Sequence, residues 1–96
     1  MKYWILFYDY PPDYFERRTP LRPDHFVHAQ RAVDAGALLL AGAFPDEPHG
    51  GVLIFAGEDA SVAEEFARND PYVLNGLVQS WRVREWTVVA GTLHTP

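Results

Sequence analysis

Uninterrupted apolar runs mark three predicted strands in this chain. Residues 2–9 carry apolar side chains on both of their alternating faces, and residues 37–44 and 52–56 do the same. A strand with one face in water alternates polar and apolar residues, whereas these three lack a polar face. Residues 78–89 predict a fourth, longer strand whose two faces differ. One of those faces carries Trp81 and Val83, and the other carries Arg82, Arg84 and Trp86.

Helical spacing separates the first strand from the second. Thr19 and Pro20 predict the start of a helix, which runs to Ala35 and stops at Gly36. Upstream of it, residues 14–18 predict a loop or a single helical turn. The apolar stripe of the helix is expected to consist of Leu21, Phe26, Ala29 and Val33.

A second helix follows the third strand. Asp59 or Ser61 can cap its start, and Ser61 with Glu64 also fits a capping box. The elements then follow the order strand, helix, strand, strand, helix, strand. This order predicts an α+β, ferredoxin-like βαββαβ fold, in which a four-stranded antiparallel sheet carries two helices on one face. The buried stripe of the second helix is predicted to be Val62, Ala63, Phe66 and Ala67.

Two helices cover only one face of such a sheet. The apolar side chains on the other face of the first three strands would form a large exposed patch, which monomers avoid. We therefore predict a symmetric homodimer that packs sheet to sheet. The chain is predicted to form a single domain over residues 1–96, with residues 90–96 as a flexible tail.

Composition and charge narrow the range of partners. Hydrophobic residues make up 48% of the 96 positions, so the chain is not expected to be disordered. The net charge of −5 argues against binding to nucleic acid, and the lack of cysteine excludes a disulfide framework. No run approaches the ~18 apolar residues of a membrane span, and the first residues look like a strand rather than a signal peptide. We expect a cytoplasmic protein that binds neither nucleic acid nor membrane.

The stretch from Asp70 to Leu77 connects the second helix to the last strand. An Asp-Pro pair is a good helix start, because the carboxylate accepts amide hydrogens and Pro71 needs no amide at the first position. Gly76 is expected to end this short turn. Asp70 is therefore either a simple cap or, in a second interpretation, the carboxylate partner of the distant His25.

Several segments occur in an order that is typical of one known family. They are the strand from Tyr3 to Asp9, Arg22-x-x-His25, Gly36 through Gly42, Asn69-Asp70-Pro71-Tyr72 with Gly76-Leu77, and Trp81-x-Val83-x-Glu85-Trp86. With these segments the chain resembles the YCII (YciI-like) family up to about Val89. The resemblance implies a ferredoxin-like subunit, a dimeric α+β barrel and an active-site histidine–aspartate pair at His25 and Asp70. Most of the family has no known substrate; related barrels isomerise lactones, eliminate halide from chlorinated ring-cleavage products or bind haem.

Physical chemistry supports a catalytic role for this pair. His25 lies near the start of the predicted first helix, whose positive end disfavours an imidazolium and keeps the ring able to take a proton. A carboxylate on one ring nitrogen fixes the tautomer and stabilises the protonated ring. The split βαβ order places the last strand beside the first strand and under the first helix, so His25 and Asp70 can meet. The residues predicted to bind substrate are Tyr8, Asp9, Arg22, Tyr72, Arg84 and Trp86.

Other readings of the charged residues stay open. Arg82 and Arg84 could hold a substrate carboxylate, or they could form ion pairs across a subunit interface. His28 can share a helix face with His25, but a metal site needs a third ligand and none is evident by spacing. No nucleotide loop, metal quartet or nucleophile motif is present, so we predict neither a metal nor a cofactor.

These observations predict a small enzyme that uses the His25–Asp70 pair for proton transfer on a small anionic metabolite. Isomerisation and elimination are the reactions that such a pair can run without a cofactor, as an isomerase or a lyase. The alternative is a non-catalytic module that binds a small molecule or a partner protein in the same dimer cleft. A third hypothesis is haem binding through a histidine, as in related barrels.

Overall fold

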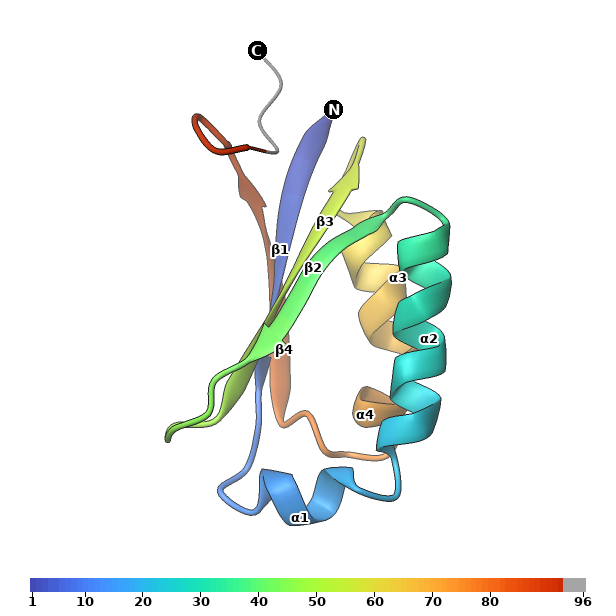
Figure 1. Cartoon of the computed structure of the whole chain (residues 1–96), viewed down its shortest axis with the longest axis vertical. Helices are drawn as coiled ribbons and strands as arrows, with labels where there is room; N and C mark the ends of the chain where they lie inside the picture. Colours follow the sequence, from blue (N-terminus) through green and yellow to red (C-terminus); the bar gives the residue numbers. More distant parts are fainter. Residues whose placement is uncertain (93–96) are drawn as a thin grey trace.

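Figure 1 shows a computed structural model of the chain, which describes residues 1–92. The elements in chain order are β1 (Lys2–Asp9), α1 (Tyr14–Arg18), α2 (Arg22–Asp34), β2 (Leu38–Ala43), β3 (Gly50–Gly57), α3 (Ser61–Asn69), α4 (Pro71–Leu74) and β4 (Ser80–Trp86). The predicted βαββαβ order is confirmed, with α1 and α4 as two short additions. The last strand is shorter than predicted, because it ends at Trp86 rather than at Val89.

The four strands form one antiparallel sheet in the order β2-β3-β1-β4. The helices α2, α3 and α4 lie on one face of this sheet, as the ferredoxin-like prediction requires, and α1 lies at its lower end in the view of Figure 1. No helix within residues 1–92 is long and apolar enough to cross a membrane. The predicted tail over residues 90–96 falls partly on residues 93–96, which lie outside the described part of the chain.

Alternation along the two central strands divides the sheet into a buried and an open face. Leu6 and Tyr8 of β1 point toward the helices and are 0% and 2% exposed, and Phe55 of β3 is 0% exposed on the same side. Because side chains alternate along a strand, Ile5 of β1 and its register partner Ile54 lie on the opposite face. That open face is largely apolar and no helix of the described chain covers it. It also carries Tyr3, Phe7, Val52, Arg82, Arg84 and Trp86.

The first long helix differs from its prediction at its start and in the face that it buries. The Thr19 hydroxyl donates to the carbonyl of Phe15 instead of capping, and α2 begins at Arg22 without a side-chain cap. Phe26 and Val33, both predicted to be buried, are 51% and 47% exposed. The predicted Leu21 and Ala29 are half-buried, and the other half-buried side chains of α2 are His25, His28 and Ala32.

Hydrogen bonding explains why α2 turns His25 and His28, rather than Phe26 and Val33, toward the interior. His25 and His28 each find a partner inside the molecule, at the Asp70 carboxylate and at the carbonyl of Phe66. A buried imidazole with a partner avoids the cost of a lost hydrogen bond, so the helix can turn these polar rings inward. The prediction of the stripe from apolar spacing alone was therefore wrong at Phe26 and Val33.

The second long helix buries the predicted stripe but starts differently. Ala63, Phe66 and Ala67 of α3 are buried, and the residue at its N-cap is Ala60, which offers no side-chain cap. The predicted Ser61–Glu64 capping box is absent from the structure. Asp59 instead accepts hydrogen bonds from both the backbone N–H and the hydroxyl of Ser61. A carboxylate close to the start of the helix thus supports it from just outside the first turn.

Candidate active site

The site is organised around Asp70, at the corner between α3 and α4. Its backbone is extended, with φ −72° and ψ 126°, and its Oδ1 accepts a hydrogen bond of 3.0 Å from the backbone N–H of Tyr72. The cap that the Asp-Pro pair predicts is therefore present, and the turn ends at Gly76, which has φ +76°. The carboxyl group is fully buried. A charged group at such a position needs several hydrogen-bond donors.

Two side chains from distant parts of the sequence provide those further donors. The Tyr8 hydroxyl of β1 donates to Asp70 Oδ2 at 2.7 Å, and His25 Nδ1 of α2 lies 2.8 Å from Asp70 Oδ1. Burial and the negative charge of Asp70 raise the pKa of Tyr8, so its hydroxyl stays protonated and donates. With the Tyr72 backbone N–H, three donors converge on the two carboxylate oxygens. Asp70 is thus both a cap and a partner of His25.

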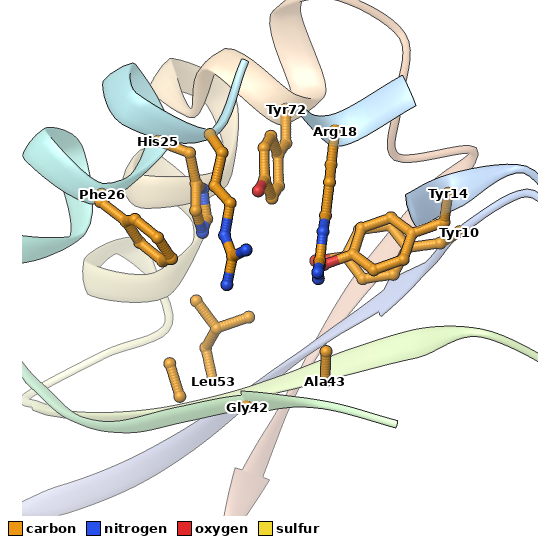
Figure 2. A pocket seen from close by; sticks show the side chains of 11 residues that line it. Tyr10, Tyr14, Arg18, His25, Phe26, Gly42, Ala43, Leu53 and Tyr72 are labelled. Atoms are coloured by element: carbon orange, nitrogen blue, oxygen red, sulfur yellow. The ribbon is translucent and has the colours of Figure 1, made fainter. Parts of the chain in front are cut away.

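The surroundings of His25 define which ring nitrogen is available for chemistry. The ring lies flat on the Tyr72 ring, with centroids 3.7 Å apart and planes 4° apart. A carboxylate can only accept, so Nδ1 carries the proton in the hydrogen bond to Asp70. In the neutral ring Nε2 then has a free lone pair. The side chain is 12% exposed and lines a cavity, toward which Figure 2 shows the ring pointing.

The cavity has a volume of about 240 Å³ and lies between the helical layer and the strand β2 (Figure 2). Its polar lining comes mainly from the start of α2 and from α1, and its apolar lining comes from the sheet and from Phe26 of α2. None of the residues that line it is acidic. They are Tyr10, Tyr14, Arg18, Arg22, His25, Phe26, Ala41, Gly42, Ala43, Leu53 and Tyr72.

Three tyrosines form the wall beside His25. Tyr10 and Tyr14 stack with centroids 3.9 Å apart, and Tyr72 meets both rings edge-on. Burial and the neighbouring Tyr14 raise the pKa of Tyr10, and burial raises the pKa of Tyr72 to about 12. The phenols of Tyr10 and Tyr72 therefore stay neutral near neutral pH and can act as hydrogen-bond donors.

The structure brings together some of the residues predicted to bind substrate. Arg22 and Tyr72 line the cavity with His25, whereas Tyr8 lies behind Asp70 and is 2% exposed. Asp9 accepts a hydrogen bond from the Ser80 hydroxyl at 2.6 Å, at the end of the β1–β4 pair. Arg84 and Trp86 lie on the open face of the sheet, opposite to the cavity, because they alternate with the inward-facing residues of β4.

Sequence reasoning missed several residues of this cavity. Tyr10, Tyr14, Arg18, Phe26 and Leu53 line it, although none of them was predicted to belong to the site. The available signal was the alternation of aromatic and arginine residues just after the end of the first strand, since strand ends next to loops collect functional side chains.

His28 does not belong to this cavity. Its Nε2 lies 2.9 Å from the Phe66 carbonyl oxygen, and its ring packs against the Phe66 ring at 4.3 Å. Because a carbonyl only accepts, Nε2 carries the proton there. His28 thus connects α2 to α3. Within residues 1–92 no group of three or more His, Cys, Asp or Glu side chains is arranged to hold a metal ion.

Comparison with protein families gives a match along most of the chain. Residues 1–87 match the family described as the YCII-related domain. Two curated relatives, both named Protein YciI, come from Escherichia coli O6:H1 and Shigella flexneri. Each is 30% identical to this chain over 95 residues, which cover 90% of this chain and 97% of the relative.

Comparison with solved structures shows the same fold in more distant proteins. A 5-chloro-2-hydroxyhydroquinone dehydrochlorinase from Burkholderia phenoliruptrix, solved with 2,5-dihydroxybenzoquinone, superposes with a TM-score of 0.75 at 17% identity. The match covers 88% of this chain and 93% of that one. An antibiotic biosynthesis monooxygenase superposes with a TM-score of 0.55 at 15% identity, covering 94% of this chain and 100% of its own. At these identities the likeness concerns the fold.

Proposed function

This chain belongs to the YCII-related domain family, and on that premise we propose that it is a small enzyme that moves a proton on a small anionic metabolite. His25 acts as the base or acid, and Asp70 orients it. The observation that carries the proposal is the contact of 2.8 Å between His25 Nδ1 and the buried Asp70 carboxylate, on a ring that also lines a cavity. This contact assigns the proton to Nδ1 and leaves Nε2 for the substrate.

The reaction follows from the charges in this pair. Nε2 takes a proton from the substrate, and the negative charge of Asp70 stabilises the imidazolium that forms. In an isomerisation the ring returns the proton to a second position of the substrate. In an elimination the electrons of the broken bond form a new double bond, a leaving group departs and the ring gives its proton to water. Neither route requires a cofactor.

Structural likeness to a dehydrochlorinase supports elimination as the first reaction to test. Dehydrochlorination removes a proton and a chloride from one molecule, and His25 Nε2 is placed to accept such a proton. We therefore offer small chlorinated ring-cleavage carboxylates as the first candidate substrates, with chloride release as the readout, and then small lactones that carry a carboxylate, with product analysis for isomerisation.

Two substitutions test the roles in the pair. We expect His25→Gln to lower turnover by a factor of about 10²–10⁴, the contribution of one positioned acid–base group. Asp70→Asn should lower turnover as well, because the amide no longer stabilises the imidazolium. His28→Gln is the matched control, as it alters a helix histidine outside the cavity. A His25→Gln protein that keeps full turnover would remove the proposal.

The alternative function, a non-catalytic binding module, is favoured by the aromatic and cationic lining of the cavity. Binding alone needs these walls but no tuned histidine. The two functions differ in the role of His25: an enzyme loses turnover on His25→Gln, whereas a binding module keeps its ligand as long as the cavity walls are intact. Ligand binding that survives His25→Gln, together with no turnover of the candidate substrates by the wild type, supports the binding module.

We also propose that the protein works as a homodimer that pairs its open sheet faces. The open face carries the half-buried Ile5 and Ile54 and the exposed Leu40 and Trp86, an apolar patch that soluble monomers rarely leave in water. Ile54→Glu should give a folded monomer in sedimentation experiments, because it places charges in the centre of the interface. Val27→Glu is the control, since Val27 is 52% exposed on α2, in the helical layer. A wild-type protein that sediments as a monomer at micromolar concentration would contradict this proposal.

A further inference from the structure

Two arginines line the cavity without an acidic partner. Arg18 is the last residue of α1 and Arg22 is the first residue of α2, so a short turn brings both guanidinium groups to the same cavity. Within residues 1–92 the ion pairs involve Arg17, Arg68 and His25, and neither Arg18 nor Arg22 takes part in one. A chain with a net charge of −5 has many carboxylates to offer, yet none of them lines this cavity.

Aromatic rings lie close to each guanidinium group. The Arg18 guanidinium carbon lies 5.1 Å from the Tyr14 ring centroid and 4.7 Å from that of Phe15. The Arg22 guanidinium carbon lies 4.9 Å from the Phe26 ring centroid. A cation–π contact of this kind stabilises a guanidinium without using its N–H donors, and a carboxylate can bind those donors with two parallel hydrogen bonds.

One internal contact uses part of this donor capacity. Arg18 Nη1 lies 3.5 Å from the Tyr14 hydroxyl, a long hydrogen bond that uses one of the five donors of the guanidinium. Figure 2 shows the Arg18 side chain reaching toward the cavity from the side opposite to Phe26. The two arginines thus border the cavity from two helices, with several donors left for an anion.

The opposite wall is apolar and the space is small. Leu53 and Ala43 of the sheet contribute aliphatic surface there, and Phe26 adds aromatic surface on the side of α2. A volume of about 240 Å³ lies below the range of about 300–1,000 Å³ for drug-sized ligands. A ligand that satisfies both walls is a small anion with a compact apolar body, such as a single ring or a short branched chain.

We infer that this cavity selects small organic carboxylates, and that Arg18 and Arg22 form the clamp that binds the carboxylate group. The inference rests on the proposed function and names the substrate class for it. Arg22 and His25 are three residues apart on α2 and therefore neighbours on one side of the helix. A carboxylate held by Arg22 leaves the apolar part of the substrate on the side of His25.

Ligand titration by NMR tests the clamp without knowledge of the true substrate. The probes are benzoate, the neutral and similarly shaped benzamide, and inorganic phosphate. We expect benzoate to give saturable shifts of the amide signals of residues 14–19, 21–22 and 41–43, and benzamide and phosphate to bind at least about tenfold more weakly. Equal binding of benzamide or phosphate would overturn the inference, since the cavity would then not select an organic carboxylate.

Substitutions assign the binding to the two arginines. Arg18→Gln and Arg22→Gln should each weaken benzoate by about tenfold or more, because each removes charged hydrogen bonds. Arg18→Lys should keep part of the affinity, as it retains the charge but loses the fork. Arg31→Gln, on an exposed part of α2, is the matched control and should bind as the wild type does. Unchanged affinity in both folded Arg→Gln proteins would refute the clamp.

The same measurement separates this inference from the proposed function. His25→Gln should still bind benzoate with nearly unchanged affinity, because the clamp holds the anion independently of the base. Binding that survives His25→Gln but is lost in Arg18→Gln and Arg22→Gln supports the clamp even if no proton transfer is found. Binding that depends on His25 and not on the arginines would contradict the clamp while leaving the base in place.

Discussion

The hydrogen bond between Tyr8 and Asp70 gives the sharpest test of how the site is supported. Tyr8→Phe removes only the hydroxyl that donates to Asp70 Oδ2 at 2.7 Å, and the aromatic ring that fills the core stays in place. The change leaves one oxygen of a fully buried carboxylate without a donor within the described structure. Since Tyr8 does not line the cavity, the substitution leaves the cavity lining unchanged.

The expected loss of stability follows from the kind of bond that is removed. A hydrogen bond to a charged group contributes about 1.5–3 kcal/mol, and the smaller desolvation cost of Phe offsets part of it. We expect a net loss of about 2 kcal/mol in the free energy of unfolding. With a urea slope of about 1.5 kcal/mol per molar, as in small domains, the unfolding midpoint falls by about 1–2 M.

Urea unfolding followed by circular dichroism measures this loss, with all variants at one protein concentration. Tyr3→Phe is the matched control in the same strand, since Tyr3 lies on the open face and makes no side-chain hydrogen bond within residues 1–92. Equal urea midpoints for Tyr8→Phe, Tyr3→Phe and wild type would refute the reasoning.

Three further predictions concern the fold around the site. Burial raises the pKa of Tyr72 from 10.0 to about 12, so the neutral phenol favours the folded state. The stability that it contributes is lost as the pH rises from 10.0 toward about 12. Absorbance measured at alkaline pH should show that Tyr72 ionises at a higher pH than free tyrosine. Gly76→Ala should lower the free energy of unfolding by about 1 kcal/mol, because Gly76 has φ +76°. Gly42→Ala is the control in the same denaturation assay and should cost less, because Gly42 has no positive φ. His28→Ala should lower stability by about 1 kcal/mol without affecting benzoate binding, since it removes the hydrogen bond to the Phe66 carbonyl.

The sequence predicted the fold from local patterns. The apolar runs, the Asp-Pro cap at Asp70 and the stop at Gly36 each follow from the chemistry of neighbouring residues, and the structure has a strand, a capped turn and a helix end at these places. The order of the elements then left few ways to pair four strands, because connections are short and handed. The βαββαβ topology could therefore be predicted from the sequence.

The cavity could be predicted from the sequence only in part. His25 and Asp70 were expected to meet, and the structure joins them at 2.8 Å. Tyr8, predicted to touch substrate, instead supports Asp70 from behind, and Arg84 lies on the other face of the sheet. Arg18 was missed because a five-residue helix has no periodicity from which to judge its direction.

The amino-acid sequence by itself determined which segments form helices and strands, and which chemical groups are present to act on a proton. The tertiary structure alone decided which face of α2 turns inward, which side of the sheet each arginine borders, and which donors stabilise the Asp70 carboxylate. The physical reason is that the spacing of apolar residues reports only whether a segment favours a helix or a strand. His25 lies 45 positions and Tyr8 lies 62 positions from Asp70 in the sequence, so their contacts with its carboxylate exist only once the chain has folded.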